Sequence, residues 1–252
     1  MAKPTPWKDE YTLLCERCGY IIEDLDQSLP CPECGKPMSE SIPEHRVGTA
    51  WQQNQCLQSL VQTMKLTLRS PIEVLRIARP FNKQTRTLRR IYQFGAGIWW
   101  TLMTLIFIGY SVSHINASHN IDLLITFYSG ILIFALLITP FVMFLSWIET
   151  LGIVFLSKRR NGRIDKDIAR SITSHGSIGW LIGSIGGSTC FLLWAMLSLQ
   201  SPWLSETLGW IGSAFVLTGF LFFETFAYLG LRRCKYANTI RPQSIPPQAP
   251  KP

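Results

Sequence analysis

Four long apolar stretches constrain this chain more than any other feature of its sequence. Each has about the 20 apolar residues that a helix needs to cross the hydrocarbon core of a bilayer. The run from Ile91 to Ile121 contains no Lys, Arg, Asp or Glu. Helices at the surface of a soluble protein have a polar face, whereas these stretches are apolar all round. We therefore expect an all-α polytopic membrane domain over 94–231, with spans near 94–113, 123–148, 176–199 and 207–231.

The Lys and Arg residues are distributed unevenly between these stretches. Of the 24, 13 precede the first stretch, 6 lie between the second and third, and 5 follow the fourth. The loops at 114–122 and 200–206 have none. Because basic residues near span ends stay in the cytoplasm, both termini are predicted to be cytoplasmic, in a protein of the bacterial inner membrane. The formal net charge of +8 then reflects topology, and the lipid bilayer is the first expected partner.

Two Cys-x-x-Cys pairs, each followed by Gly, lie near the N-terminus. They are Cys15 with Cys18 and Cys31 with Cys34, and twelve residues separate the pairs. The two thiolates of a pair can reach one ion, and two pairs complete a tetrahedral site of four sulfurs. Cytoplasmic thiols stay reduced, which favours metal binding over disulfides. We predict a small β-type zinc ribbon within residues 1–45, although the four ligands alone do not distinguish zinc from iron.

A site with four Cys ligands has no open position for water or a substrate, so the expected Zn²⁺ is structural. Its binding would supply folding energy that so short a segment lacks. Residues 1–45 carry four basic and nine acidic side chains, a formal charge of −5. Phosphate binding needs a basic surface, so nucleic acid is not the expected ligand. The predicted partner is a cytoplasmic protein, and the alternative is docking on the chain's own basic residues.

The segment 46–93 is predicted to be a basic amphipathic linker in the cytoplasm or at the membrane interface. Nine basic residues and one acid, Glu73, lie within 46–90. Two interpretations stay open: helices that lie on an anionic inner leaflet, or charges that only hold the topology. One predicted helical face gathers the apolar residues Leu57, Leu60, Val61, Met64 and Leu68.

Two further cytoplasmic segments are predicted. After the second span, Ile164, Ile168 and Ile172 recur every four residues, which predicts a short helix that lies in the membrane interface. Residues 232–252 are predicted to form a Pro-rich tail.

Glu149 and Glu224 lie in or near apolar spans, where a carboxylate is costly and often functional. The alternative to an adaptor is therefore a small transporter or channel component that uses both glutamates. Otherwise they are interfacial residues that bond between helices or pair with a nearby Arg. His175, just before the third span, is a further candidate partner for one of them. The sequence contains no nucleophile–base pair, phosphate-binding loop or open metal site, so we do not expect an enzyme.

The third span carries glycines at every fourth position, namely Gly179, Gly183 and Gly187. Such stripes of small residues let two helices pack closely. We expect this stripe to pack inside the bundle, and the alternative is contact between two copies of the chain in a homo-oligomer.

The order of these parts resembles bacterial membrane proteins that carry a short N-terminal zinc ribbon before a multi-pass domain. The stretches 147–150 (WIET) and 174–180 (SHGSIGW) are similar to the Yip-like membrane domain. That resemblance implies a helical bundle associated with trafficking or membrane organisation, with no catalytic residues to transfer. Yip-like proteins usually have five spans, one more than we expect here. We predict an integral membrane scaffold or adaptor whose structural zinc ribbon mediates protein–protein contact.

Overall fold

The structure is a computed structural model that describes residues 11–80, 82–114, 121–197 and 202–239. The chain forms two compact units. The first comprises the described residues of 1–84, 150–172 and 228–252, and the second comprises those of 85–149 and 173–227. Most of the predicted Pro-rich tail lies outside the described residues.

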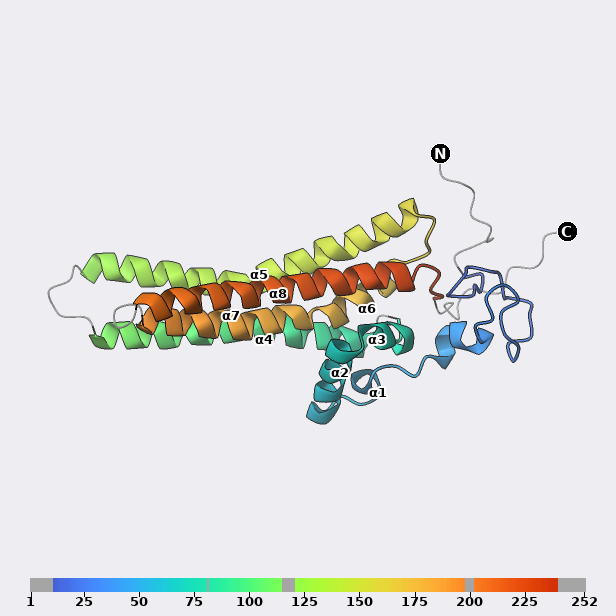
Figure 1. The fold of residues 1–252 in the computed structure, drawn as a ribbon, viewed down its shortest axis with the longest axis horizontal. Coiled ribbons are helices and arrows are strands. Elements are labelled where there is room, and N and C mark those ends of the chain that lie inside the picture. Colours follow the sequence, from blue (N-terminus) through green and yellow to red (C-terminus); the bar gives the residue numbers. More distant parts are fainter. Residues whose placement is uncertain (1–10, 81, 115–120, 198–201, 240–252) are drawn as a thin grey trace. The chain divides into compact units, whose positions relative to one another are not determined.

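Three of the four predicted spans lie within long helices, and the helix of the third covers 178–197 of the predicted 176–199 (Figure 1). Four helical segments are long and apolar enough to cross a membrane, as the sequence predicts for a membrane protein. Three of the helices extend well beyond the predicted apolar segments, because a helix keeps its internal hydrogen bonds when its side chains turn polar. The helices are α4 (Lys83–His114), α5 (Ile121–Arg159), α7 (Ile178–Leu197) and α8 (Pro202–Arg233).

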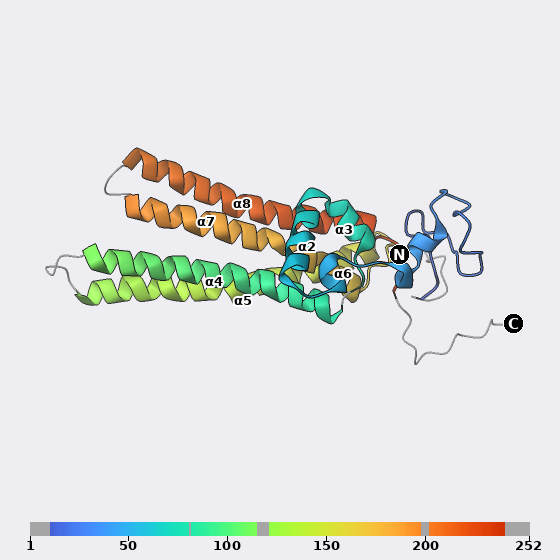
Figure 2. The ribbon, with the colours of Figure 1, turned by 90° about the horizontal axis from the view of Figure 1, so that it is seen from below.

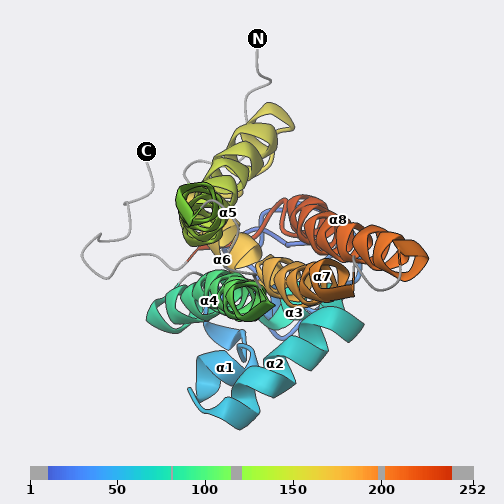
Figure 3. The same ribbon diagram turned by 90° about the vertical axis from the view of Figure 1, so that its left-hand side faces the viewer.

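The second unit consists of two helical hairpins, α4 with α5 and α7 with α8 (Figures 2 and 3). Within the first hairpin, Gln93 Nε2 donates a hydrogen bond to Ser146 Oγ at 2.9 Å. Between the hairpins, the Trp99 indole N–H of α4 donates to Thr189 Oγ1 of α7 at 3.4 Å. Helices α4 and α7 are therefore neighbours across the two hairpins.

The glycine stripe of α7 packs against α8 of the same chain. A Cβ added to Gly219 of α8 would lie 2.4 Å from the carbonyl oxygen of Gly179 and 2.8 Å from Cα of Gly183. A Cβ added to Gly187 would lie 2.5 Å from Val216 Cγ2. Close backbone approach thus requires Gly on both helices. The stripe is used inside the bundle, and contact between two copies of the chain stays a prediction.

The first unit contains the cysteine module and several short helices. The β-type ribbon is not confirmed, because between residues 11 and 80 the structure has only two isolated bridges, Leu14 to Ile21 and Pro30 to Pro37. Proline lacks the N–H needed to continue a ladder, which limits the second bridge. The short elements are η1 (Met38–Ser41), η2 (Pro43–His45), α1 (Ala50–Gln53), α2 (Leu57–Arg69) and α3 (Pro71–Ile77).

The short helix predicted after the second span is α6 (Lys166–Gly176). Ile164, Ile168 and Ile172 are all buried in protein, so this apolar face does not face lipid. The position of the helix at the level of the membrane interface stays a prediction. Ile172 packs against Gly230 of α8 so closely that an added Cβ there would lie 2.4 Å from its Cγ2. The Ser171 hydroxyl donates to the Arg79 carbonyl at 3.0 Å. The apolar face of α6 belongs to the core of the first unit.

Candidate metal centre

The structure brings the four predicted ligands together. The sulfurs of Cys15, Cys18, Cys31 and Cys34 all lie within 4.8 Å of one another. The Sγ–Sγ distance is 3.5 Å between Cys15 and Cys34 and 3.7 Å between Cys18 and Cys31. A tetrahedral ion with metal–sulfur bonds of about 2.3 Å separates its sulfurs by about 3.8 Å. The four cysteines can therefore hold one metal ion.

Both Cys-x-x-Cys turns have the same backbone fold. The Cys15 N–H donates to the Tyr20 carbonyl and the Gly19 N–H donates to the Cys15 carbonyl, each at 2.8 Å. The Gly after each second Cys is in the left-handed region, with φ of +81° at Gly19 and +70° at Gly35. Glycine suits this position because it adopts a positive φ without the steric cost of a Cβ. In the second turn, the Cys31 N–H donates to the Lys36 carbonyl and the Gly35 N–H donates to the Cys31 carbonyl, again at 2.8 Å each.

Backbone N–H groups of these turns point at the sulfurs and influence their ionisation. Burial opposes ionisation of Cys15, but hydrogen bonds from the backbone of Cys18 and Arg17 and from neighbouring thiols outweigh it and lower the pKa of Cys15 to about 7. Burial, with the neighbouring thiols, raises the pKa of Cys18 to about 12 despite a hydrogen bond from the Tyr20 backbone. Without a bound cation, Cys15 therefore ionises readily, whereas ionisation of the neighbouring Cys18 is unfavourable. A bound metal ion removes that conflict, because it takes thiolates as ligands.

The module has a very small apolar core. It consists of Cys15, Ile22, Cys31 and Met38, with Leu13 and Cys34 packed against it. Half of these side chains are candidate metal ligands. A core of this size does not offset the conformational entropy lost on folding, so contacts with the rest of the chain, and an ion at the four cysteines when one is bound, would stabilise the module.

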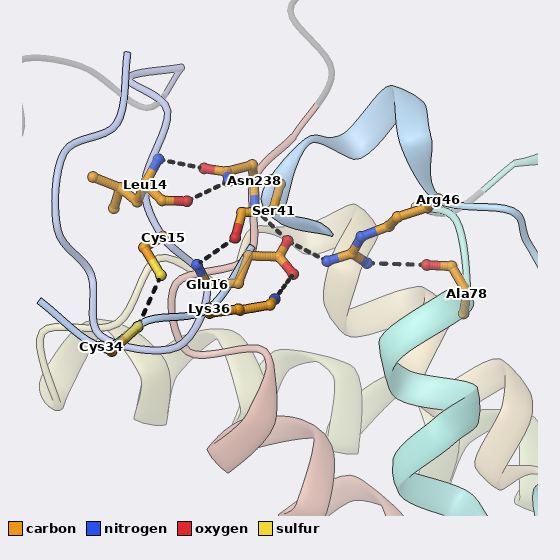
Figure 4. A network of polar contacts seen from close by, with 9 residues as sticks. All are labelled: Leu14, Cys15, Glu16, Cys34, Lys36, Ser41, Arg46, Ala78 and Asn238. Carbon is orange, nitrogen blue, oxygen red and sulfur yellow. Dashed lines mark hydrogen bonds and ion pairs between the residues drawn. The ribbon is translucent and has the colours of Figure 1, made fainter. Parts of the chain in front are cut away.

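A residue from the segment after α8 clamps the module. Asn238 is 1% exposed, and its side chain makes three hydrogen bonds to the module's backbone (Figure 4). Its Oδ1 accepts from the Leu14 N–H at 3.0 Å, and its Nδ2 donates to the carbonyls of Leu14 and Ser41 at 2.7 Å each. Sequence reasoning missed this residue, since a lone Asn in a polar tail belongs to no pattern.

Glu16, between the first two ligands, forms a largely buried ionic contact with the basic linker. Its carboxylate accepts from the guanidinium of Arg46, which also donates to the Ala78 carbonyl at 3.0 Å. Lys36 Nζ lies 3.8 Å from the same carboxylate (Figure 4). The Asn238 N–H donates to Glu16 at 3.3 Å. On this face the module docks on the chain's own basic residues, as one of the two alternatives expected.

Two more contacts join the module to distant parts of the first unit. The Arg163 side chain donates to the Thr12 carbonyl, and its backbone N–H donates to the Lys235 carbonyl at 2.7 Å. The Tyr236 ring packs on the first Cys-x-x-Cys turn, where a Cβ added to Gly19 would lie 2.9 Å from the ring. The module, the loop after α5 and the segment after α8 therefore form one packed assembly.

The two acidic residues of the spans form a second candidate site, within the second unit. Glu149 of α5 and Glu224 of α8 are half-buried, and they lie close enough for their charges to interact. His175, the third residue predicted here, is buried in α6. An apolar groove of about 890 Å³ also opens between the hairpins, and no charged residue lines it among those described. Its larger lining residues include Trp100, Phe107, Phe134, Trp180, Phe191 and Leu217.

Comparisons with protein-family models, with curated proteins and with solved structures give no match to this chain. The resemblance to the Yip-like membrane domain therefore stays a prediction.

Proposed function

We propose that this protein is an integral membrane scaffold whose zinc-bound module binds a cytoplasmic protein. The proposal rests on one observation, the contrast between the two faces of the module. One face is held by Glu16, Asn238 and their partners. Away from those contacts, residues 23–30 are all exposed, although they belong to a module ordered by its own turns.

The exposed part of the module combines apolar and acidic side chains. Tyr20, Ile21, Leu25 and Leu29 are exposed apolar residues. Tyr20 and Ile21 also line a hollow of about 450 Å³, together with Cys18, Gly19 and Glu33. Exposed aromatic and aliphatic groups near a hollow are typical of protein-binding surfaces. Between them lie the acidic residues Glu23, Asp24 and Asp26, which favour a partner with a basic rim.

Zinc is the proposed ion, and its role is to hold the binding surface in shape. The four ligands complete its coordination, which leaves no position for substrate. Elemental analysis of protein purified from native membranes should find about one Zn per chain. A stoichiometric iron content, with the colour of an iron–thiolate centre, would replace zinc in this proposal.

The proposed placement of the module in the cytoplasm rests on the distribution of basic residues. A reporter that is active only in the cytoplasm, fused after Pro252, should be active. A second reporter within the 200–206 loop should be inactive. The reverse pattern would put the module outside and remove the cytoplasmic partner.

The binding test uses surface variants rather than ligand variants. We expect crosslinked capture from native membranes to recover a partner with the wild type and to lose it with Leu25→Ser/Leu29→Ser, because these side chains are exposed and not part of the module's core. Gln27→Ser, in the same loop, is the matched control and should retain the partner. Equal zinc content in all three proteins shows that the module is intact. Full recovery with the Leu25→Ser/Leu29→Ser variant contradicts the proposal.

A transporter or channel component is the second candidate, and the two half-buried carboxyl groups of Glu149 and Glu224 favour it. Carboxyl groups in a membrane domain suit the binding of a proton or cation. This candidate requires that Glu149→Gln and Glu224→Gln abolish function without loss of expression or zinc. Retained function in both variants leaves the scaffold as the better account.

A further inference from the structure

The apolar face of α2 is only partly covered by protein, since Leu60 and Met64 are half-buried and the other three residues of the face are exposed. Leu57 is 77% exposed, Val61 41% and Leu68 43%. An amphipathic helix of a soluble domain normally turns its apolar stripe toward the core. In α2 the buried side chains are instead polar, namely Ser59, Thr63 and Thr67.

Specific hydrogen bonds fix this rotation of the helix about its own axis. Thr63 Oγ1 accepts from the Trp51 N–H of α1 at 3.0 Å. Thr67 Oγ1 donates to the Thr63 carbonyl at 2.7 Å, so its hydroxyl is satisfied while buried. The polar side of α2 is therefore its protein-facing side, and the apolar stripe points outward. Helix α6 of the same chain does the opposite and buries Ile168 and Ile172, so an amphipathic helix of this protein does not always leave its apolar face exposed.

The charges beside the stripe match an anionic lipid surface. Lys65 and Arg69 are exposed and lie next to the apolar stripe in helical register. Long basic side chains can place their methylenes along an apolar surface and their charges at the level of lipid phosphates. In α3, which follows directly, Ile72 is 45% exposed and extends the uncovered apolar surface.

Chain connectivity keeps α2 near the bilayer. Residues 70–82 separate it from α4, the helix of the first span, and seven of them form α3. At 1.5 Å per helical residue and up to about 3.6 Å per extended residue, this connection reaches at most roughly 30 Å. Helix α2 is therefore tethered within roughly 30 Å of the first residue of α4, the helix that contains the first predicted span.

We propose that α2 lies in the interface of an anionic bilayer leaflet. Leu57, Val61 and Leu68 insert toward the acyl chains, and Lys65 and Arg69 contact the phosphates. The basic linker then binds lipid in addition to fixing the topology. This surface is separate from the exposed loop of the cysteine module and holds whether or not a protein binds there.

The test compares two adjacent exposed positions on different faces of α2. Val61→Cys and Gln62→Cys are each labelled with an environment-sensitive fluorophore in the full-length, metal-loaded chain, with Cys56→Ser and Cys190→Ser in the background. The protein is placed in nanodiscs of phosphatidylcholine, alone or mixed with phosphatidylglycerol, that contain a lipid with a nitroxide near the start of its acyl chain. We expect roughly threefold more quenching at 61 than at 62, and a larger difference with phosphatidylglycerol.

Three results would overturn the proposal. Equal quenching at both positions means that α2 does not lie in the interface. Shielding of the label at 61 in native membranes but not in pure lipid means that a protein covers the stripe. Phosphatidylglycerol is expected to increase the difference in quenching between positions 61 and 62. If Lys65→Gln/Arg69→Gln leaves this increase unchanged, these two side chains do not contact the phosphates. Both labelled positions are exposed, so neither label should disturb the packing of α2. Equal metal content in the two labelled proteins checks that their fold is intact.

Discussion

Replacement of Asn238 by Ala removes the three hydrogen bonds that clamp the cysteine module. All three have donor–acceptor distances between 2.7 and 3.0 Å and join a buried side chain to buried backbone groups. At about 1 kcal/mol of net stabilisation per bond, their loss costs about 3 kcal/mol. Three backbone groups at Leu14 and Ser41 would lose their partners as well, so this figure is a lower bound unless water enters.

That free energy should appear as lost metal affinity. Metal binding and folding of the module are linked, and the clamp fits only the folded module. A loss of about 3 kcal/mol then weakens the apparent metal affinity by about 100-fold. The assay is competition for Zn²⁺ between the full-length protein in nanodiscs and a chromophoric chelator of known affinity. Asn54→Ala, at an exposed position, is the matched control and should stay within about twofold of wild type.

An affinity of Asn238→Ala equal to that of wild type would refute the reasoning. It would mean that the module folds around its ion without the tail, and that the clamp only orders the segment after α8. Asn238→Asp sharpens the test, because it keeps the acceptor but loses both donors and places a second carboxylate beside Glu16. We expect it to be at least as weak as Asn238→Ala.

Acidification should release the metal in a single cooperative step, because the ligands must be thiolates, and elemental analysis after gel filtration at falling pH follows this loss. Burial raises the pKa of the Cys234 thiol to about 11, whereas hydrogen bonds from the side chain and backbone of Ser59 lower the pKa of Cys56. At pH 8, mass spectrometry should therefore find alkylation at Cys56 before Cys234, and the stability that the neutral Cys234 thiol contributes should be lost between pH 9 and 11. In α8, Gly219→Ala should lower the midpoint of thermal aggregation and Gly209→Ala should not, because an added Cβ at Gly219 meets backbone at 2.4 Å and one at Gly209 meets only a side chain at 3.5 Å.

The features that could be predicted from sequence are those set by local composition or spacing. The four spans follow from runs of apolar residues, and the cluster of Cys15, Cys18, Cys31 and Cys34 follows from two short repeats. The Asn238 clamp could not be predicted, because its contact with Leu14 joins residues 224 positions apart and leaves no periodic trace. The partner of Glu16 could not be predicted either. Several other basic residues of the linker carry the same charge as Arg46 and lie at similar distances along the chain.

Helices α2 and α6 show a second limit of sequence reasoning. Both repeat apolar residues with helical period, which predicts the membrane interface for α6 and makes it one of two open interpretations for α2. Periodicity reports that a helix has an apolar face, but it does not report what covers that face. In α6 the face is covered by protein at Gly230, and in α2 the hydrogen bond from Trp51 to Thr63 turns the face outward. The deciding information lies in contacts made by other elements.

The two faces of the cysteine module have a consequence for how its function is tested. Metal loss removes the exposed loop at 23–30 and the contacts of Glu16 and Asn238 together, since all depend on the folded module. A partner lost in Cys31→Ser/Cys34→Ser is therefore compatible with a docking surface and also with collapse of the first unit. Leu25→Ser/Leu29→Ser changes the exposed loop alone, whereas Asn238→Ala changes the clamped face alone. A scaffold requires that the loop variant loses its partner while retaining zinc, and that the clamp variant, saturated with zinc, retains both.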